Sequence, residues 1–273
     1  MPPSVRLFSI VQSTDGVPEP PNRNSPHVAP GNPDLFHTNP TMNSLNTGRV
    51  AQTLQRMFAE AEQADRELMA QFGEAEQSEQ VLADAIAKHF AEESRDVRGF
   101  YHGYVENFLN VTPEYGLFLY QCARASKATR IVEFGTSMGV STVYLAAALR
   151  DNGGGHLIGS ELEASKAARA CANLEAAGLA DMVDIRVGDA RQTLADLQGE
   201  IDLVLLDGAF SLYLPVLKSL EPWLRNGALI LAENAFDREN PYLEYVRDPA
   251  NGYLSRSIPI DPGRGNEFTV VTR

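Results

Sequence analysis

The 273-residue chain lacks the features that mark secreted, membrane-spanning or nucleic-acid-binding proteins. Its two cysteines, Cys122 and Cys171, are too few for a disulfide framework, and they do not form a C-x-x-C pair. No run of five lysines or arginines occurs, and 23 basic against 36 acidic side chains give a net charge of −13. Such acidity opposes binding to nucleic acid or to an anionic membrane. The longest apolar runs, such as residues 228–232, are far too short to span a bilayer.

The N-terminus also lacks the basic region, apolar core and small-residue cleavage site of a secretory signal. With 44% hydrophobic and 22% charged residues, the composition is that of an ordinary globular protein. We therefore expect a cytoplasmic enzyme or binding domain that has neither a nucleic-acid nor a membrane partner.

Two segments precede the part of the chain that carries the motifs. Nine of the 16 prolines fall within the first 40 residues, which predicts a flexible, proline-rich arm over residues 1–45. From Thr47 onward, apolar residues recur at helical spacing in three segments. We expect residues 46–110 to form a helical layer that covers a site or forms a homodimer interface, because its first helix has a long apolar face.

From residue 128 onward, strand and helix patterns alternate, with glycine-containing turns between them. The predicted strands are 130–134, 156–160, 183–187, 201–206, 228–232, 255–260 and 267–272. The predicted helices are 47–73, 79–93, 97–109, 140–149, 164–176, 190–197 and 214–224. The alternation predicts an α/β fold with a parallel, doubly wound sheet. The last two strands are joined by a short loop and form a hairpin, which makes the final strand antiparallel.

The most informative motif lies at residues 131–142, where a buried strand runs into Gly135 and Gly139 and a helix begins. Glycines at such a turn allow a ligand to approach the backbone closely. The motif lacks the G-x-G-x-x-G spacing, and Glu133 stands at the end of the strand. Its carboxylate would repel a pyrophosphate and suits a ligand with a positive charge or several donors. The alternative is a tight strand–helix turn that binds no ligand.

Two further acids, Glu161 and Asp189, follow the second and third strands of this region. Glu161, which lies 22 residues beyond Gly139, is placed to accept both ribose hydroxyls of a nucleoside, and Asp189 is placed to lie beside an adenine. Each acid alone is often a helix N-cap. Acids at the ends of three consecutive strands are a more specific pattern, because ligands of open α/β sheets bind at those ends.

Residues 111–273 resemble the class I S-adenosylmethionine-dependent methyltransferases, in particular the catechol and caffeoyl-CoA O-methyltransferases and their bacterial small-molecule relatives. The matching segments are Val111–Gly116, Val132–Gly135, Gly139–Ser141, Glu161, Gly188–Ala190, Leu206–Gly208, Tyr213 and Glu233–Asn234. The resemblance implies an S-adenosylmethionine-binding methyltransferase domain over 111–273. It also implies a Rossmann-like sheet of seven strands whose last strand is antiparallel.

Residue by residue, the resemblance implies a cofactor site and a metal site. The implied cofactor-binding residues are Val111, Glu133, Gly135, Ser141, Glu161, Asp189, Ala190 and Asp207. A divalent metal would be held by Asp207, Glu233 and Asn234. Three hard oxygen donors at adjacent strand ends suit Mg²⁺. The metal would bind neighbouring hydroxyls of the substrate, lower their pKa and align an oxyanion with the methyl sulfonium.

Two positions depart from the family pattern. The family carries a lysine three residues after the metal-binding aspartate, where this chain has Phe210, and a second aspartate where it has Glu233. The extra methylene moves the carboxylate by roughly 1.5 Å, enough to shift or spoil a metal site. In the alternative without a metal, Asp207 is a polar cap at the end of a strand and residues 233–234 form a turn.

A reaction without the metal needs another base, and residues 100–104 cluster a histidine with aromatic side chains. A neutral imidazole accepts protons near pH 7, which makes His102 a catalytic candidate together with Asp207. Candidate walls of a substrate pocket are Tyr101, Tyr104, Phe210 and Tyr213. The alternative is that these rings only pack.

The pattern as a whole predicts an S-adenosylmethionine-dependent O-methyltransferase that acts on a hydroxyl, expected to be phenolic, of a small molecule or natural-product intermediate. Because Phe210 replaces the lysine, the alternative is altered chemistry with the same cofactor: N- or C-methylation, or a cofactor-assisted cyclisation. A nicotinamide dehydrogenase would share the acid after the second strand, but the missing G-x-G-x-x-G and the Glu133 carboxylate count against it. A non-enzymatic interaction module would explain the arm but none of the strand-end acids.

Overall fold

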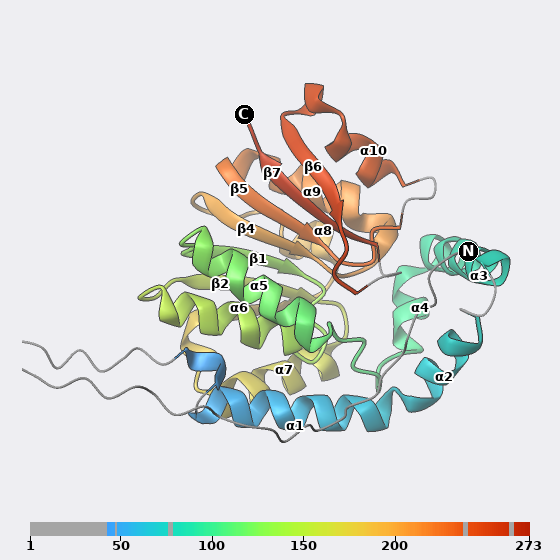
Figure 1. Ribbon diagram of the computed structural model, residues 1–273, viewed down its shortest axis with the longest axis horizontal. Helices are drawn as coiled ribbons and strands as arrows, with labels where there is room; N and C mark the ends of the chain where they lie inside the picture. The colour runs from blue at the N-terminus through green and yellow to red at the C-terminus, as the bar shows by residue number, and fades with distance from the viewer. Residues whose placement is uncertain (1–42, 47, 76–78, 237–239, 262–264) are drawn as a thin grey trace, which may run out of the picture. The chain divides into compact units, whose positions relative to one another are not determined.

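The architecture is that of a computed structural model, in which the described residues are 43–46, 48–75, 79–236, 240–261 and 265–273 (Figure 1). Nearly all of the predicted arm over residues 1–45 lies outside them. No helix in these described ranges is long and apolar enough to cross a membrane.

All seven predicted strands are present, and they form one sheet. They are β1 (Arg130–Phe134), β2 (His156–Glu161), β3 (Val183–Val187), β4 (Ile201–Leu206), β5 (Leu224–Ala232), β6 (Tyr253–Ile258) and β7 (Asn266–Val271). The strand order is β3-β2-β1-β4-β5-β7-β6. The first five strands pair in parallel, whereas β7 pairs antiparallel with both β5 and β6. The predicted doubly wound sheet with an antiparallel last strand is confirmed.

Helices precede the sheet and alternate with its strands. They are α1 (Gly48–Ala64), α2 (Arg66–Ala75), α3 (Glu79–Arg95), α4 (Val97–His102), α5 (Pro113–Ala125), α6 (Val140–Asp151), α7 (Ala164–Ala177), α8 (Ala190–Thr193), α9 (Tyr213–Leu220) and α10 (Pro241–Arg247).

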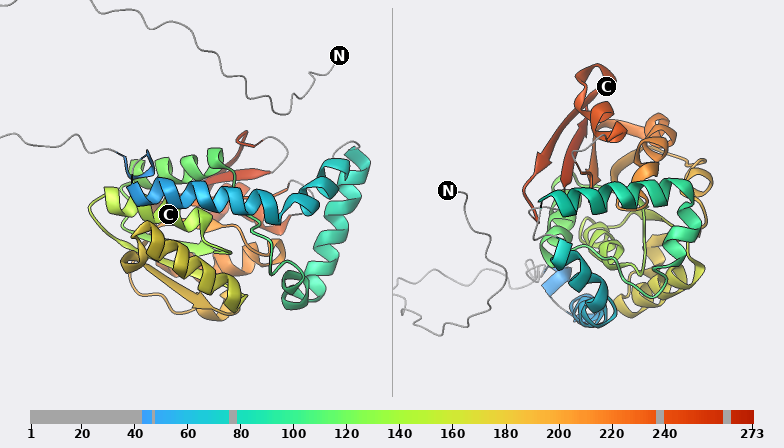
Figure 2. Two further views of the ribbon diagram at one scale, coloured as in Figure 1. Left: turned by 90° about the horizontal axis from the view of Figure 1, so that it is seen from below. Right: turned by 90° about the vertical axis from the view of Figure 1, so that its right-hand side faces the viewer.

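Helices lie on both faces of the sheet (Figure 1), and each face carries a hydrophobic core. Side chains of a strand alternate between its faces, so Leu203 and Leu205 of β4 belong to one core and Val204 and Leu206 to the other. The first core is completed by α1, α5, α6 and α7, and the second by α8, α9 and α10. Figure 2 shows α3 and α4 at one edge of the sheet, where Glu93 of α3 binds the backbone that follows β4.

The apolar face of α1 is buried within the same chain. Val50, Leu54 and Met57 are at most 6% exposed and belong to the first core. The polar side of α1 also contacts α7, because Arg56 Nη2 donates to Asn173 Oδ1 at 2.8 Å. The apolar face that motivated the homodimer prediction is therefore covered without a second chain.

One predicted helix is divided at a residue whose side chain binds another part of the chain, although the backbone bonds Asp65 N to Ala61 O and Met69 N to Asp65 O, both 2.8 Å, continue across this point. The helix predicted over 47–73 breaks at Asp65, between α1 and α2. Asp65 is buried, and its carboxylate accepts hydrogen bonds from the backbone N–H groups of residues 108 and 109, at 2.9 and 3.0 Å. These bonds help to hold a loop, and the helix predicted over 97–109 accordingly ends at His102.

Two helices, α5 and α10, were not predicted. Each has proline at its start and a capping side chain before it: Thr112 Oγ1 accepts from Tyr115 N at 3.1 Å, and Asn240 Oδ1 accepts from Tyr242 N at 3.0 Å. Proline at the first helical position behind a threonine or asparagine cap is a recognised helix-start signal. The sequence therefore contains the signal for both helices.

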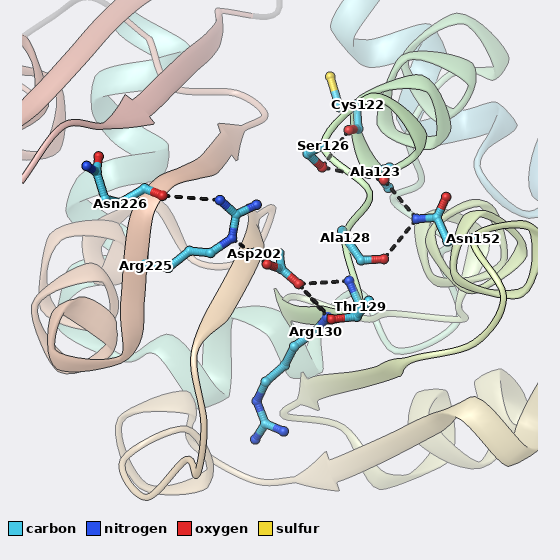
Figure 3. Close-up of polar contacts among 10 residues, drawn as sticks. All are labelled: Cys122, Ala123, Ser126, Ala128, Thr129, Arg130, Asn152, Asp202, Arg225 and Asn226. Atoms are coloured by element: carbon cyan, nitrogen blue, oxygen red, sulfur yellow. Dashed lines mark hydrogen bonds and ion pairs between the residues drawn. The ribbon is translucent and has the colours of Figure 1, made fainter.

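The amino-terminal ends of three neighbouring strands are tied together by Asp202 of β4 (Figure 3). Its carboxylate accepts hydrogen bonds from Thr129 N (2.7 Å), Arg130 N (2.9 Å) and Arg225 Nε (2.5 Å). Thr129 and Arg130 lead into β1, and Arg225 lies at the start of β5. Burial tends to raise the pKa of Asp202, but these hydrogen bonds outweigh it and lower that pKa. The ionised carboxylate thus aligns β1, β4 and β5.

Candidate active site at the carboxyl ends of the strands

The turn between β1 and α6 is held together by the carboxylate of Glu133. This side chain is 0% exposed and accepts hydrogen bonds from Thr136 Oγ1 (3.0 Å), Ser141 Oγ (2.7 Å) and Thr142 Oγ1 (2.6 Å). Burial raises the pKa of Glu133, although the three hydroxyl donors act in the opposite direction. Three donors from one short segment fix the backbone of the turn.

Gly135 brings the end of β1 against the backbone that follows β4. Its φ is +96°, in the region that favours glycine. A Cβ atom at this position would overlap the backbone carbonyl of Asp207. A side chain here would therefore push Asp207 away from the turn.

A cavity of about 710 Å³ opens where the strands end. Its walls come from the turns after β1, β2, β3 and β4 and from residues 94–101 of the helical layer. The predicted cofactor residues in its lining are Gly135, Glu161, Asp189, Ala190 and Asp207. A second, smaller cavity shares Gly135 and Asp207 with the first and is also lined by Ser141. The volume is in the range of cofactor pockets.

Glu161, the last residue of β2, presents a buried carboxylate to this cavity. One carboxylate oxygen accepts a hydrogen bond from Ser137 N (2.7 Å) and the other from Glu163 N (2.9 Å). Burial raises the pKa of Glu161, although the backbone N–H groups and the Lys166 ammonium act in the opposite direction. The backbone N–H of Leu162 also acts on this carboxylate, which has about four acceptor positions, so acceptor capacity remains for a ligand hydroxyl.

Asp189 follows β3 and caps α8. Its carboxylate accepts a hydrogen bond from Arg191 N at 2.9 Å and forms an ion pair with the Arg191 guanidinium at 2.5 Å. The Arg191 side chain, followed by its backbone N–H, holds the pKa of Asp189 below its usual value. Asp189 is thus a helix cap, and it also lines the cavity beside the buried Ala190.

The predicted metal ligands stand at the ends of β4 and β5. Asp207 N donates to Phe134 O (2.9 Å) and Glu233 N donates to Leu206 O (3.0 Å), so the hydrogen-bond ladder of the sheet continues to both residues. Asp207 and Glu233 are therefore neighbours on adjacent strand ends. Asn234 has a φ of +56°, which asparagine tolerates better than most residues.

Two buried tyrosines lie within electrostatic reach of Asp207 and Glu233. Tyr213 Oη donates to the backbone oxygen of Glu233 at 2.7 Å. Tyr115 is 0% exposed, and its hydroxyl has no hydrogen-bond partner among the described residues. Burial and then the charges of Glu233 and Asp207 raise the pKa of both tyrosines well above the usual value. Both phenols therefore stay protonated, and each has an O–H group that can donate a hydrogen bond near these carboxylates.

The carboxylate of Glu93, in the helical layer, binds the segment that follows β4. Glu93 of α3 is 0% exposed and accepts hydrogen bonds from Ser211 N (2.8 Å), Phe210 N (3.2 Å) and Tyr101 Oη (2.9 Å). Its Oε2 also lies 3.4 Å from His89 Nε2. Burial tends to raise the pKa of Glu93, but the His89 contact and the hydrogen bonds outweigh it and lower that pKa. An ionised carboxylate therefore fastens α3 to this strand-end segment.

Comparison with known proteins identifies the family. Residues 132–235 match a family described as a methyltransferase domain. The chain is 35% identical over 164 residues to a catechol O-methyltransferase of Niastella koreensis, and the alignment covers 56% of this chain and 73% of that protein. The chain belongs to the class I S-adenosylmethionine-dependent O-methyltransferases. The predicted family and enzyme class are confirmed, and so is S-adenosylmethionine as the cofactor, whereas the divalent cation stays a prediction.

Other relatives of the methyltransferase agree. It is 34% identical over 125 residues to a catechol O-methyltransferase of Mycobacterium tuberculosis, covering 45% of this chain and 56% of that protein. The crystal structure of the O-methyltransferase TomG from Streptomyces achromogenes, in complex with S-adenosylmethionine, has a TM-score of 0.55 and 27% identity and covers 60% of this chain and 82% of that one. These matches favour O-methylation over the N- or C-methylation and cyclisation alternatives.

The aromatic residues predicted as pocket walls occupy different environments in the methyltransferase. Tyr101 lines the large cavity, whereas Tyr104, Phe210 and Tyr213 are absent from its described lining. The Phe210 ring instead packs against the rings of His89 and Phe90, with centroid distances of 5.0 and 5.4 Å. The Phe210 ring therefore packs against α3 of the helical layer.

His102, predicted as an alternative base, lies at the surface of the methyltransferase. Its side chain is 72% exposed, and Nδ1 is 3.3 Å from Glu163 Oε2. It is not part of the described lining of either cavity. Val111 and Glu133 are also absent from that lining, because both are buried behind it. A base role for His102 stays a prediction; its exposed imidazole contacts Glu163, which lines the large cavity.

Three residues at this edge of the methyltransferase were not singled out from the sequence: Glu93, Lys166 and Tyr115. Glu93 belongs to an acid-rich helical pattern that resembles a solvated surface, so no local signal distinguishes it. Lys166 lies five residues after Glu161, in the first turn of α7, and the sequence indicated only that it belongs to a helix. Tyr115 follows the Thr112 cap, a signal that would have placed it on α5.

Proposed function

We propose that the methyltransferase transfers the methyl group of S-adenosylmethionine to a phenolic hydroxyl of a small molecule. The observation that carries this proposal is a pair of carboxylates on adjacent strand ends: Asp207, which lines the cavity, and its neighbour Glu233. The two catechol O-methyltransferases that the chain resembles support an aromatic diol as the acceptor.

The cofactor would lie along the ends of β1, β2 and β3. We propose that Glu161 accepts both ribose hydroxyls and that Asp189 and Ala190 flank the adenine. At the other end, Gly135 and Ser141 would border the methionine part; Gly135 lines the large cavity, and Ser141 lines a void of about 10 Å³ beside it. Glu133 would act on this end indirectly, through its hydrogen bond from Ser141, and the buried Val111 would act through packing.

The side chains at the ends of β4 and β5 fit a divalent cation. Asp207, Glu233 and Asn234 offer only hard oxygen donors, which Mg²⁺ prefers. The Tyr115 hydroxyl, buried beside them without a partner among the described residues, is suited to donate to an oxygen bound at this place. No group of three or more His, Cys, Asp or Glu side chains that could hold a metal occurs in the described ranges, so the Asn234 amide would have to complete the set.

When bound, Mg²⁺ supplies the Lewis acidity that lowers the pKa of the acceptor hydroxyl. The chain itself would orient the acceptor and exclude water. Tyr213 holds the backbone of Glu233 in place, and Glu93 holds the segment after Asp207 against the helical layer. We keep Asp207 as the proposed catalytic residue, because it borders both cavities.

Isothermal titration with S-adenosylhomocysteine tests the cofactor assignment. We expect Glu161→Ala to weaken binding at least tenfold, since it removes two charge-assisted hydrogen bonds. Glu175→Ala, at an exposed position of α7, is the control and should bind like wild type. Equal affinities of Glu161→Ala and wild type would refute the ribose assignment.

Turnover of catechol and related phenols, with Mg²⁺ or with EDTA, tests the reaction. We expect methylation to require Mg²⁺ and to be lost in Asp207→Ala. Without the Asp207 carboxylate the cation would lose a ligand and could no longer align the acceptor hydroxyl. Full activity in EDTA would remove the metal from the mechanism. The homodimer stays a prediction, which sedimentation equilibrium can check.

A further inference from the structure

Lys166 carries a buried positive charge on the wall of the large cavity. It lies in the first turn of α7, is 4% exposed and is one of the cavity's lining residues. Its Nζ is 3.3 Å from Ser137 Oγ, in the turn after β1. Ser137 N in turn donates to the Glu161 carboxylate at 2.7 Å. The ammonium therefore stands beside the proposed ribose site.

The Lys166 ammonium has more donors than the protein satisfies. An ammonium has three N–H groups, and one of them has a described partner, the neutral Ser137 hydroxyl. Glu161, Asp65, Glu163 and Glu106 attract the charge, but no carboxylate oxygen of the described residues lies within 4.0 Å of it. A buried charged group with unfilled donors is costly. From the two remaining N–H groups we infer that an oxygen acceptor binds to the ammonium inside the cavity.

The surroundings also indicate the kind of acceptor. Four carboxylates act on this ammonium, so a further anion, such as the carboxylate of the cofactor's amino acid, would be repelled. Neutral hydroxyl oxygens meet no such repulsion. The ribose of S-adenosylmethionine would place its hydroxyls at Glu161, the first of the four acids.

We propose that Lys166 is a cofactor-binding residue whose ammonium donates a hydrogen bond to a ribose hydroxyl oxygen while Glu161 accepts the hydroxyl protons. This proposal rests on the ribose assignment of Glu161. Together, one donor and one acceptor group bind both sides of the ribose diol.

Isothermal titration of Lys166→Met with two ligands tests the proposal. S-adenosylhomocysteine contains the ribose and the amino acid, whereas 5′-methylthioadenosine keeps the ribose and lacks the amino acid. We expect Lys166→Met to weaken both ligands to the same extent, by about 10–100-fold, as for loss of a charged hydrogen bond. The control is Lys218→Met on α9, which removes the same charge from a side chain that is 46% exposed and should leave both affinities unchanged.

The outcomes separate the possible roles of Lys166. Weakening of S-adenosylhomocysteine alone would place Lys166 at the amino-acid end and overturn the proposal. Unchanged affinity of Lys166→Met for both ligands would also overturn the proposal. If Glu161→Ala binds the ligands more weakly than wild type in the same series, the proposed function still stands. If wild type binds neither ligand, both proposals fall.

A measurement on the unaltered protein gives a second readout, for which a variant that keeps the charge is needed only to assign the signal. The chain has four lysines: Lys88, Lys127, Lys166 and Lys218. In protein labelled with ¹⁵N-lysine, a slowly exchanging ammonium resonance, assigned through Lys166→Arg, should shift when either ligand is added. If the Lys166 resonance stays in place at saturating 5′-methylthioadenosine, the ammonium does not contact the ribose.

Discussion

Replacing Glu93 by alanine should loosen the helical layer from the strand-end segment that borders the cofactor cavity. The carboxylate accepts three hydrogen bonds, from Ser211 N, Phe210 N and Tyr101 Oη, and is 0% exposed. In Glu93→Ala, the two backbone N–H groups lose their acceptor in a place where water has little access. Hydrogen bonds to a charged group contribute about 1.5–3 kcal/mol each.

The net loss is smaller than the sum of these bonds, because the wild-type carboxylate also gave up its hydration. Removing one partner of a buried charged network typically costs about 3–5 kcal/mol, which lowers the melting temperature by roughly 10 °C in a chain of this size. The cavity is lined by Ser211 and Tyr101, so we also expect weaker binding of S-adenosylhomocysteine.

Urea unfolding followed by circular dichroism measures the stability change, and calorimetry measures the cofactor affinity. Glu92→Ala is the matched control, because Glu92 is the preceding residue of α3, has a side chain that is 46% exposed and pairs only loosely with Lys88, at 3.8 Å. If Glu93→Ala is no less stable than Glu92→Ala, the three hydrogen bonds do not fasten the helical layer and the reasoning is wrong.

Two further predictions concern pH and the opposite edge of the sheet. Affinity for S-adenosylhomocysteine should fall as the pH is lowered, because only ionised Glu161 accepts both ribose hydroxyls. Burial raises the pKa of Glu161, against the opposing effect of Lys166. The loss of affinity should therefore begin above pH 4.5, the usual glutamate value. A calorimetric pH series on Glu161→Gln should lack this transition, and an unchanged profile would assign it to another group, such as Glu133. Asp202→Ala should lower the free energy of unfolding by about 2–4 kcal/mol in urea. Since the fold lowers the pKa of Asp202, its contribution is present above pH 3.8 and disappears as the carboxylate protonates; an equal deficit of the variant at pH 2 and pH 7 would contradict this.

The strands and their order of appearance were predictable because burial of a parallel sheet leaves a periodic, apolar signal in each short segment. The ends of those segments also located Glu161, Asp189 and Asp207, since polar residues directly after buried strands must gather at one edge. The starts of α5 and α10 carried equally local information, because each combines a capping side chain, Thr112 or Asn240, with proline at the first helical position.

What the sequence by itself determined is therefore the sheet, its edge and the acids along that edge, all of which depend on neighbours within a few residues. The tertiary structure decided which side chains use that edge: it buried Glu93 against the backbone of Phe210, placed Lys166 on the cavity wall, and left His102 in solvent. Glu93 and Phe210 are 117 residues apart, and a contact over that distance depends on how whole layers pack. No local period or spacing encodes it.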